Sequence, residues 1–209
     1  MHRPRVRPNR RSGVDPTKLA LTSMLAASAF TVLSAFVEGG GTKHLDRAVR
    51  RRMQPRKRPR IRDAANMLTS IASPHTHPLI AVALGIIASR RTGRIAYAIF
   101  AASVGATVVD KVVRLIIHQK RPPLAGVHHG LDRYAFPSGH TCAATAIALA
   151  FVIHIWPTLS EVQRRAAAAL AISLSLGVGW TRLYLDEHWI DDIIGGCLAG
   201  VTVGSIASA

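Results

Sequence analysis

The sequence predicts an all-α membrane protein, a bundle of about six transmembrane helices with a basic amphipathic helix after the first span. Two observations lead to this fold class. Apolar residues make up 49% of the 209 residues and gather in long runs, while the charged residues gather between those runs. Trp156, Trp180 and Trp189 stand at the ends of apolar runs, where an indole ring prefers the level of the lipid headgroups.

The charge balance is strongly basic, with 27 Lys and Arg against 11 Asp and Glu. Such an excess indicates a polyanionic partner: nucleic acid, an anionic membrane surface or a phosphorylated substrate. Both cysteines, Cys142 and Cys197, lie inside apolar runs. This placement excludes a disulfide-stapled secreted scaffold and argues against a zinc site built from cysteines.

Residues 1–18 are basic, rich in proline and without periodicity, so they are predicted to form a disordered tail that sets orientation or contacts anionic lipids. Residues 19–209 are predicted to form one transmembrane domain. Its first span covers residues 19–37, which carry no charge and have about the length needed to cross the hydrocarbon. A cleavable signal peptide is the alternative, because residues 27–29 resemble a cleavage site, but the apolar run continues beyond them.

Residues 38–63 carry ten Lys and Arg. Leu45, Val49 and Met53 recur among them at helical spacing, which predicts an amphipathic helix lying on the membrane surface. Nucleic-acid binding by residues 55–62 is the alternative. No aromatic residue is interleaved there for base stacking, so we expect no nucleic-acid partner.

Five further apolar segments follow, at residues 64–89, 95–117, 141–156, 166–181 and 188–207. The first of them is interrupted at residues 73–78, so its spanning part is expected to begin near Pro78. Small residues at 101–106, 166–170 and 195–200 allow close approach of helix backbones. With six spans, the ends of the first, third and fifth face one side of the membrane.

The polar side chains that could carry out chemistry fall into three clusters at these ends of the spans. The first, residues 114–122, contains Arg114 and Arg121, which are two helical turns apart and share a face. Two guanidinium groups on one face suit bidentate binding of phosphate oxygens. Anchoring to lipid headgroups is the alternative interpretation of this pair.

The second cluster, residues 137–140, opens an apolar segment. Ser138 and Gly139 offer a hydroxyl and free backbone N–H groups at a helix start, where the helix dipole favours an anion. His140 stands in the first turn, where it could donate a proton. A helix-capping serine and an interfacial histidine are the alternative.

The third cluster, residues 181–192, opens the last segment. His188 and Asp192 share a helix face at i, i+4, so the carboxylate can hold one imidazole nitrogen and leave the other as nucleophile or base. Arg182 could reach the same anion. All three clusters lie at ends that face one side, which favours a common site.

Together these clusters resemble the three-part motif of the type 2 phosphatidic acid phosphatase family, which shares its site with vanadium haloperoxidases. The resemblance covers residues 114–192, in the family's order and spacing. It implies that His188 is a nucleophile that forms a phosphohistidine, that Asp192 orients it, and that His140 protonates the leaving oxygen. It also implies the following phosphate-binding groups, with no metal and no cofactor: Arg114, Arg121, Arg182, the Ser138 hydroxyl and the Gly139 N–H.

Three positions depart from the family's pattern. Arg114 stands where the family has Lys, Thr181 replaces Ser, and Asp186 stands where a small Gly is common. Asp186 adds negative charge near an anion site, which bears on substrate preference more than on catalysis. Lys111, Glu187 and Asp191 lie close by without an assigned role.

These features predict an integral membrane phosphatase acting on a lipid phosphate or pyrophosphate, first an isoprenyl (undecaprenyl-type) pyrophosphate and, as alternatives, phosphatidic acid or phosphatidylglycerophosphate. A vanadate-dependent haloperoxidase would share the site, but those enzymes are soluble. A basic membrane-anchored binding protein without activity is the other alternative.

The expected location is the bacterial inner membrane, with the site on the extracytoplasmic face as in the family. The charge count conflicts with this orientation, because the side of the termini holds eleven Lys and Arg and the side of the site holds sixteen. A basic helix on the membrane surface would account for part of that excess.

Overall fold

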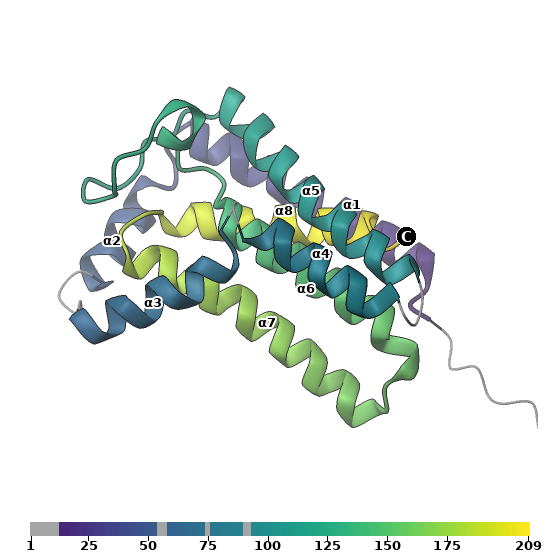
Figure 1. The fold of residues 1–209 in the computed structure, drawn as a ribbon. Helices are drawn as coiled ribbons and strands as arrows, with labels where there is room; N and C mark the ends of the chain where they lie inside the picture. Colours follow the sequence, from purple (N-terminus) through teal and green to yellow (C-terminus); the bar gives the residue numbers. More distant parts are fainter. Residues whose placement is uncertain (1–12, 54–57, 74–75, 90–92) are drawn as a thin grey trace, which may run out of the picture.

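The structure is a computed structural model that describes residues 13–53, 58–73, 76–89 and 93–209. Within these ranges all regular elements are helical, apart from one isolated bridge between Lys120 and Tyr134. The long helices form one bundle (Figure 1), and α2, α3 and the connection between α5 and α6 gather at one of its ends.

The helices are α1 (Pro16–Glu38), α2 (Lys43–Met53), α3 (Pro59–Ile71), α4 (His77–Ser89), α5 (Gly93–Ile116), α6 (Gly139–Ile155), α7 (Glu161–Tyr184) and α8 (Ile190–Ile206). Asp15 caps α1 by accepting a hydrogen bond from the Thr17 N–H, so this helix begins three residues before the expected span. Residues 1–12 of the predicted tail lie outside the described residues. The break between α3 and α4 falls at the predicted interruption.

Three of the described helical stretches are long and apolar enough to cross a membrane: α1, α6 with its following turn to Thr158, and α7. Large apolar side chains such as Leu25, Phe100 and Leu170 are exposed, as expected of a surface that faces lipid. The predicted count of six is not confirmed by length and composition. α4 has only 13 residues, and α5 and α8 carry acidic or basic groups of the predicted site at one end.

The segment predicted as a surface helix contains α2. Its Leu45 is 50% exposed, whereas Asp46 is 4% exposed, so α2 turns a polar side toward the protein. The location of α2 on a membrane surface stays a prediction, and residues 54–57 of the same segment lie outside the described residues.

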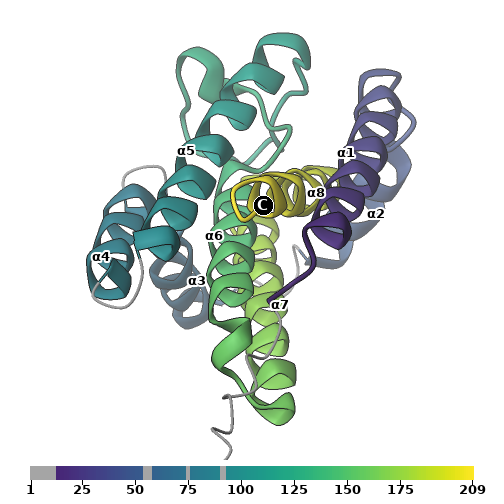
Figure 2. The same ribbon diagram turned by 90° about the vertical axis from the view of Figure 1, so that its right-hand side faces the viewer.

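The core is a contact between α6 and α8, with α1 packed on α8 and α5 on α6 (Figure 2). Small residues line this contact, among them Cys142, Ala146 and Ala199. A β-carbon on Gly200 would lie 2.7 Å from the Cys142 carbonyl oxygen, and one on Gly204 would lie 2.8 Å from the Ala146 carbonyl oxygen. Glycine therefore allows the two helix backbones to approach each other closely.

Candidate active site

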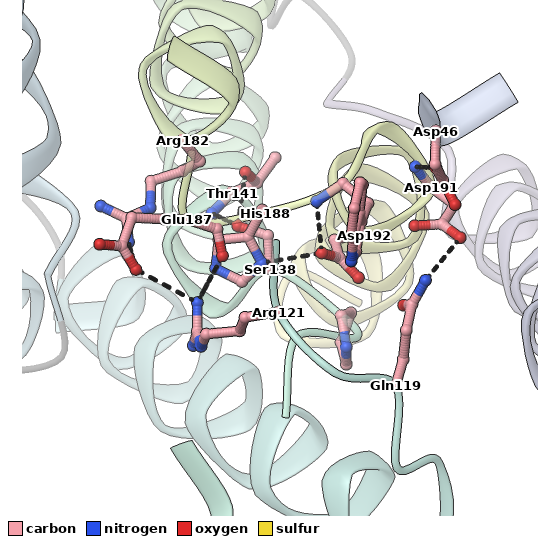
Figure 3. Close-up of polar contacts among 12 residues, drawn as sticks. Asp46, Gln119, Arg121, Ser138, Thr141, Arg182, Glu187, His188, Asp191 and Asp192 are labelled. Carbon is pink, nitrogen blue, oxygen red and sulfur yellow. Dashed lines mark hydrogen bonds and ion pairs between the residues drawn. The ribbon is translucent and has the colours of Figure 1, made fainter. Parts of the chain in front are cut away.

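The three predicted clusters meet at the end of the bundle that holds α2 and α3 (Figure 3). Ser138 joins the start of α6 to the start of α8, because its N–H donates to the Asp192 carbonyl oxygen over 3.0 Å. Since α5, α6, α7 and α8 each begin or end here, residues far apart in sequence share one small volume.

His188 and Asp192 form a buried pair. His188 Nδ1 lies 3.1 Å from Asp192 Oδ2, and the side chains are 1% and 0% exposed. The same carboxylate oxygen accepts the Trp189 N–H over 2.7 Å, which fixes its position.

On the other side of the ring, Arg121 Nη1 lies 3.1 Å from His188 Nε2. Arginine only donates, so Nε2 is the acceptor and Nδ1 carries the proton that Asp192 accepts. Burial, followed by the charges of Arg121, Arg182 and Arg114, holds the pKa of His188 well below its usual value of 6.5. The imidazole is therefore neutral at pH 7, with its Nε2 lone pair facing the arginines.

Arg121 is positioned by backbone oxygens. Its Nε donates to the Asp132 carbonyl oxygen over 2.8 Å and its Nη1 to the Glu187 carbonyl oxygen over 2.7 Å. Arg182, at the end of α7, donates to Thr69 Oγ1 of α3 over 3.2 Å. The charges of both guanidinium groups act on His188. The expected common helix face of Arg114 and Arg121 is wrong, because α5 ends at Ile116 and Arg121 lies beyond it.

Arg114 is engaged differently. It lies 2.7 Å from Asp110 and 3.0 Å from Asp132, and it donates to the Pro137 carbonyl oxygen over 3.3 Å. A hydrogen bond from Lys111 and the charges of Lys111 and Arg114 lower the pKa of Asp132 although burial opposes this. The Arg114 charge is therefore paired with carboxylates before any phosphate arrives.

The second cluster stands at the start of α6. Ser138 caps the helix: its hydroxyl oxygen lies 3.0 Å from Thr141 Oγ1 and 3.4 Å from the Thr141 nitrogen. The capping alternative is thus observed, and the hydroxyl still has its own hydrogen to donate. His140 is half-buried in the first turn. A β-carbon on Gly139 would lie 2.8 Å from Asp110 Oδ1, so a larger residue there would displace the Asp110 side chain.

Glu187 is a site residue without a predicted role. Its carboxylate lies 3.6 Å from Arg121 and 3.7 Å from Arg182, between the two cations. It also lies 2.7 Å from His128 Nε2 and accepts the Gly126 N–H over 3.2 Å. The Gly126 hydrogen bond, Arg182 and His128 lower the pKa of Glu187 against the effect of burial, so an anion already occupies the space between the arginines.

Asp46, Gln119 and Asp191 form a second buried polar group beside the pair. Asp191 Oδ2 accepts from Gln119 Nε2 over 2.9 Å and from Thr42 Oγ1 over 2.6 Å. Burial and the neighbouring Asp191 raise the pKa of Asp46 to about 7. The acidic run 186–187 and 191–192 was the available signal for these contacts, but their partners lie too far away in sequence to be paired from it.

Within the described ranges, no three His, Cys, Asp or Glu side chains cluster as metal ligands would. The arrangement instead offers a neutral imidazole nitrogen, a carboxylate behind it and guanidinium groups in front. A metal-free reaction stays a prediction.

Comparison with known proteins gives a family. A family model described as the PAP2 superfamily matches residues 54–209. Phosphatidylglycerophosphatase B of Bacillus subtilis is 27% identical over 180 residues, covering 82% of this chain and 86% of that protein. The putative undecaprenyl-diphosphatase YbjG of Escherichia coli is 36% identical over 75 residues, 36% of this chain and 33% of that protein.

Two crystal structures share the fold. The transmembrane PAP2 type phosphatidylglycerolphosphate phosphatase from Bacillus subtilis superimposes with a TM-score of 0.76 at 21% identity, covering 92% of this chain and 93% of that one. Aquifex aeolicus LpxE superimposes with a TM-score of 0.61 at 20% identity, covering 78% of this chain and 94% of that one.

Proposed function

The chain belongs to the PAP2 superfamily of membrane phosphatases, and we propose that it removes phosphate from a lipid phosphate or pyrophosphate through a phosphohistidine at His188. One observation carries the proposal: a buried imidazole whose Nδ1 is held by Asp192 directs Nε2 toward Arg121. The arginines that surround Nε2 suit a phosphoryl group better than a neutral substrate.

In the first step, His188 Nε2 forms a bond to phosphorus as the bond from phosphorus to the leaving oxygen breaks. His140, protonated when the negative charge of the bound phosphoryl group offsets the nearby arginines, donates a proton to that oxygen. Asp192 stabilises the imidazolium that develops on His188. Arg121 and Arg182 bind the equatorial oxygens together with Ser138 and Gly139. Arg114, already paired with Asp110 and Asp132, acts at longer range by adding positive charge.

In the second step, water attacks the phosphohistidine. His140 takes a proton from the water, the N–P bond breaks, and inorganic phosphate leaves. Positioning and charge stabilisation are the main contributions that a protein can make to phosphoryl transfer.

An apolar cavity supports a substrate with a hydrocarbon tail. It measures about 360 Å³ and is lined by residues of α4, α6 and α7 and by the end of the α3 region. Ala144 and Val178 line it, and each stands one helical turn from a predicted site residue, His140 and Arg182. From Ala144 to the last lining residue of α6 the helix rises about 16 Å, about half the thickness of the hydrocarbon.

Three lipids are candidates for the substrate. An isoprenyl pyrophosphate is the first choice from the sequence, and the matched stretch of YbjG supports it. Phosphatidylglycerophosphate is favoured by the relative whose likeness extends over most of both chains. Phosphatidic acid completes the set to be tested.

We place the site on the extracytoplasmic face of the inner membrane. The carboxyl end of α8 lies at the opposite end of the bundle from the site (Figure 1), which supports termini on the other side. Reporter fusions after Gly93 and Gly126 test the orientation, and a cytoplasmic signal after Gly126 would contradict it.

The decisive experiment measures phosphate release by detergent-purified protein from isoprenyl pyrophosphates, phosphatidic acid and phosphatidylglycerophosphate, with chelator present. Release that is lost in His188→Ala supports the mechanism, and the ranking of substrates identifies the lipid. Val178→Phe should raise KM for long-chain substrates but not for a short soluble phosphate ester, because it fills the cavity. No release from any lipid by folded protein would refute the proposal.

A further inference from the structure

The turn between α7 and His188 has an unusual backbone. Asp186 has a φ of 64°, the left-handed region that side chains other than Gly, Asn and Asp rarely adopt. The N–H groups of Asp186 and Glu187 donate to the carbonyl oxygens of Leu183 and Arg182 over 3.1 and 3.0 Å. This turn therefore sets the spacing between Arg182 at the end of α7 and His188 before α8.

Asp186 is also a buried acid, with its side chain 3% exposed, and it lines the same crevice as His188. Its charge is paired by Arg50 of α2. Arg50 Nε lies 2.9 Å from Asp186 Oδ1 and Nη2 lies 2.9 Å from Oδ2, a bidentate pair across 136 residues of sequence. The two parallel hydrogen bonds fix the orientation of the carboxylate, and the guanidinium group neutralises its charge.

A second contact of α2 reaches the other side of His188. Asp46, four residues before Arg50 and on the same helix face, lies 3.4 Å from the Asp191 nitrogen. Val49 and Met53 line the same crevice as His188 and Trp189. α2 thus contacts the chain two residues before the histidine and three residues after it.

We propose that Arg50 is a positioning residue for His188, a role that rests on the proposed function: by clamping Asp186 it holds the left-handed turn that aims the imidazole. It also neutralises a carboxylate that would otherwise repel the phosphoryl group. The basic helix α2 is thereby a part of the active site that does not touch the substrate.

The test compares phosphate release by Arg50→Ala, Arg50→Lys, Asp186→Gly and the double variant Arg50→Ala/Asp186→Gly. Arg50→Ala should lower kcat about 10- to 100-fold with a smaller change in KM, because a small misplacement of a reacting group is costly. Arg50→Lys should recover part of the loss, since it keeps the charge but not the bidentate geometry. Arg51→Ala, an exposed neighbour on the same helix, is the matched control and should keep the wild-type kcat.

The double variant decides between clamping and a general effect on folding. Glycine adopts a positive φ without strain and removes the buried charge, so Arg50 should no longer matter. We expect kcat of the double variant to lie within about twofold of Asp186→Gly alone, as for a pair whose coupling has been removed. A double variant several-fold slower than Asp186→Gly alone, or an Arg50→Ala protein with wild-type kcat, would overturn the inference.

A readout independent of activity is hydrogen exchange of the peptide covering residues 183–189. Arg50→Ala should speed exchange of its amides, Arg51→Ala should not, and the double variant should match Asp186→Gly. If wild-type protein released no phosphate but showed this pattern, the proposed function would fail and the clamp would stand. Unchanged exchange in Arg50→Ala would refute the clamp whatever the activity.

Discussion

The contact between α6 and α8 changes character along its length. At the end where both helices begin, it carries Ser138, His140 and Asp192, and two of these side chains are fully buried. One to two turns further on, the same two helices meet through Cys142, Ala146 and other small residues. The difference shows that the apolar part sets the distance between the helices, and the polar part uses that distance to hold groups that would be costly to bury alone.

The largest expected effect comes from removing the chemistry and leaving the packing. His188→Ala should lower phosphate release at least about a thousandfold, because an essential nucleophile is lost. The matched control is His154→Ala, a histidine further along α6 that hydrogen-bonds its own helix at Ala150. Measured phosphate release should be lost in His188→Ala and kept in His154→Ala. A comparable loss in both variants would contradict the separation of the α6–α8 contact into a chemical part and a packing part.

Removal of one guanidinium group should cause a smaller loss of activity. Arg121→Gln should lower kcat/KM about 100-fold, the usual cost of one donor to a developing charge. It should also move the acid limb of the pH profile of kcat/KM. Removing this cation raises the pKa of His188, so its neutral form is lost at a higher pH than in the wild type. Because both proteins are measured with the same substrate, the titration of the substrate affects both profiles equally. An acid limb that does not shift would argue against His188 as the titrating group.

The opposite experiment disturbs the packing and leaves the chemistry. Gly200→Ala places a β-carbon 2.7 Å from the Cys142 carbonyl oxygen and should lower the free energy of unfolding by about 1–3 kcal/mol. Gly93→Ala is its control, since a β-carbon there meets nothing within 4 Å among the residues that the structure describes. Unfolding in detergent measures both, and equal stabilities would show that the helices tolerate separation.

Glu187→Gln should have the smallest effect and the opposite sign. It removes the carboxylate charge between Arg121 and Arg182 and keeps an oxygen for the Gly126 N–H. Inorganic phosphate should inhibit this variant about three- to tenfold more strongly, a modest part of a like-charge interaction near a protein surface. Weaker inhibition would mean that holding residues 126–128 matters more than charge.

Sequence spacing was sufficient for the centre of the site. The i, i+4 spacing of His188 and Asp192 predicts their contact, and the alternation of spans predicts that Arg121 and Arg182 lie at one end. The expected common helix face is wrong, because α8 begins at Ile190 and His188 precedes it. The resemblance identified the remaining site residues and the family, although the roles assigned to them stay proposals.

The sequence did not predict which residues pair with the arginines and acids around the site. Asp132 and Glu187 pair with arginines from segments between the long helices, and the course of such segments cannot be read from helical spacing. Asp46 and Arg50 contact residues more than 130 positions away. α2 was interpreted as a surface helix from Leu45, Val49 and Met53. In the structure its polar residues Asp46 and Arg50 contact the chain on either side of His188, and Val49 and Met53 line the crevice beside that histidine. The span count was harder for a related reason: charges that serve the site shorten the apolar runs of α5 and α8.

The apolar cavity beside the site has a kinetic consequence. Leu170 and Leu174 line it and are exposed on the side of α7, so a lipid tail can reach it sideways from the bilayer. A substrate that arrives this way diffuses in two dimensions and never passes through water. Turnover should then follow the mole fraction of substrate in the membrane, and dilution with inert lipid should slow the enzyme even when the bulk concentration of substrate stays constant.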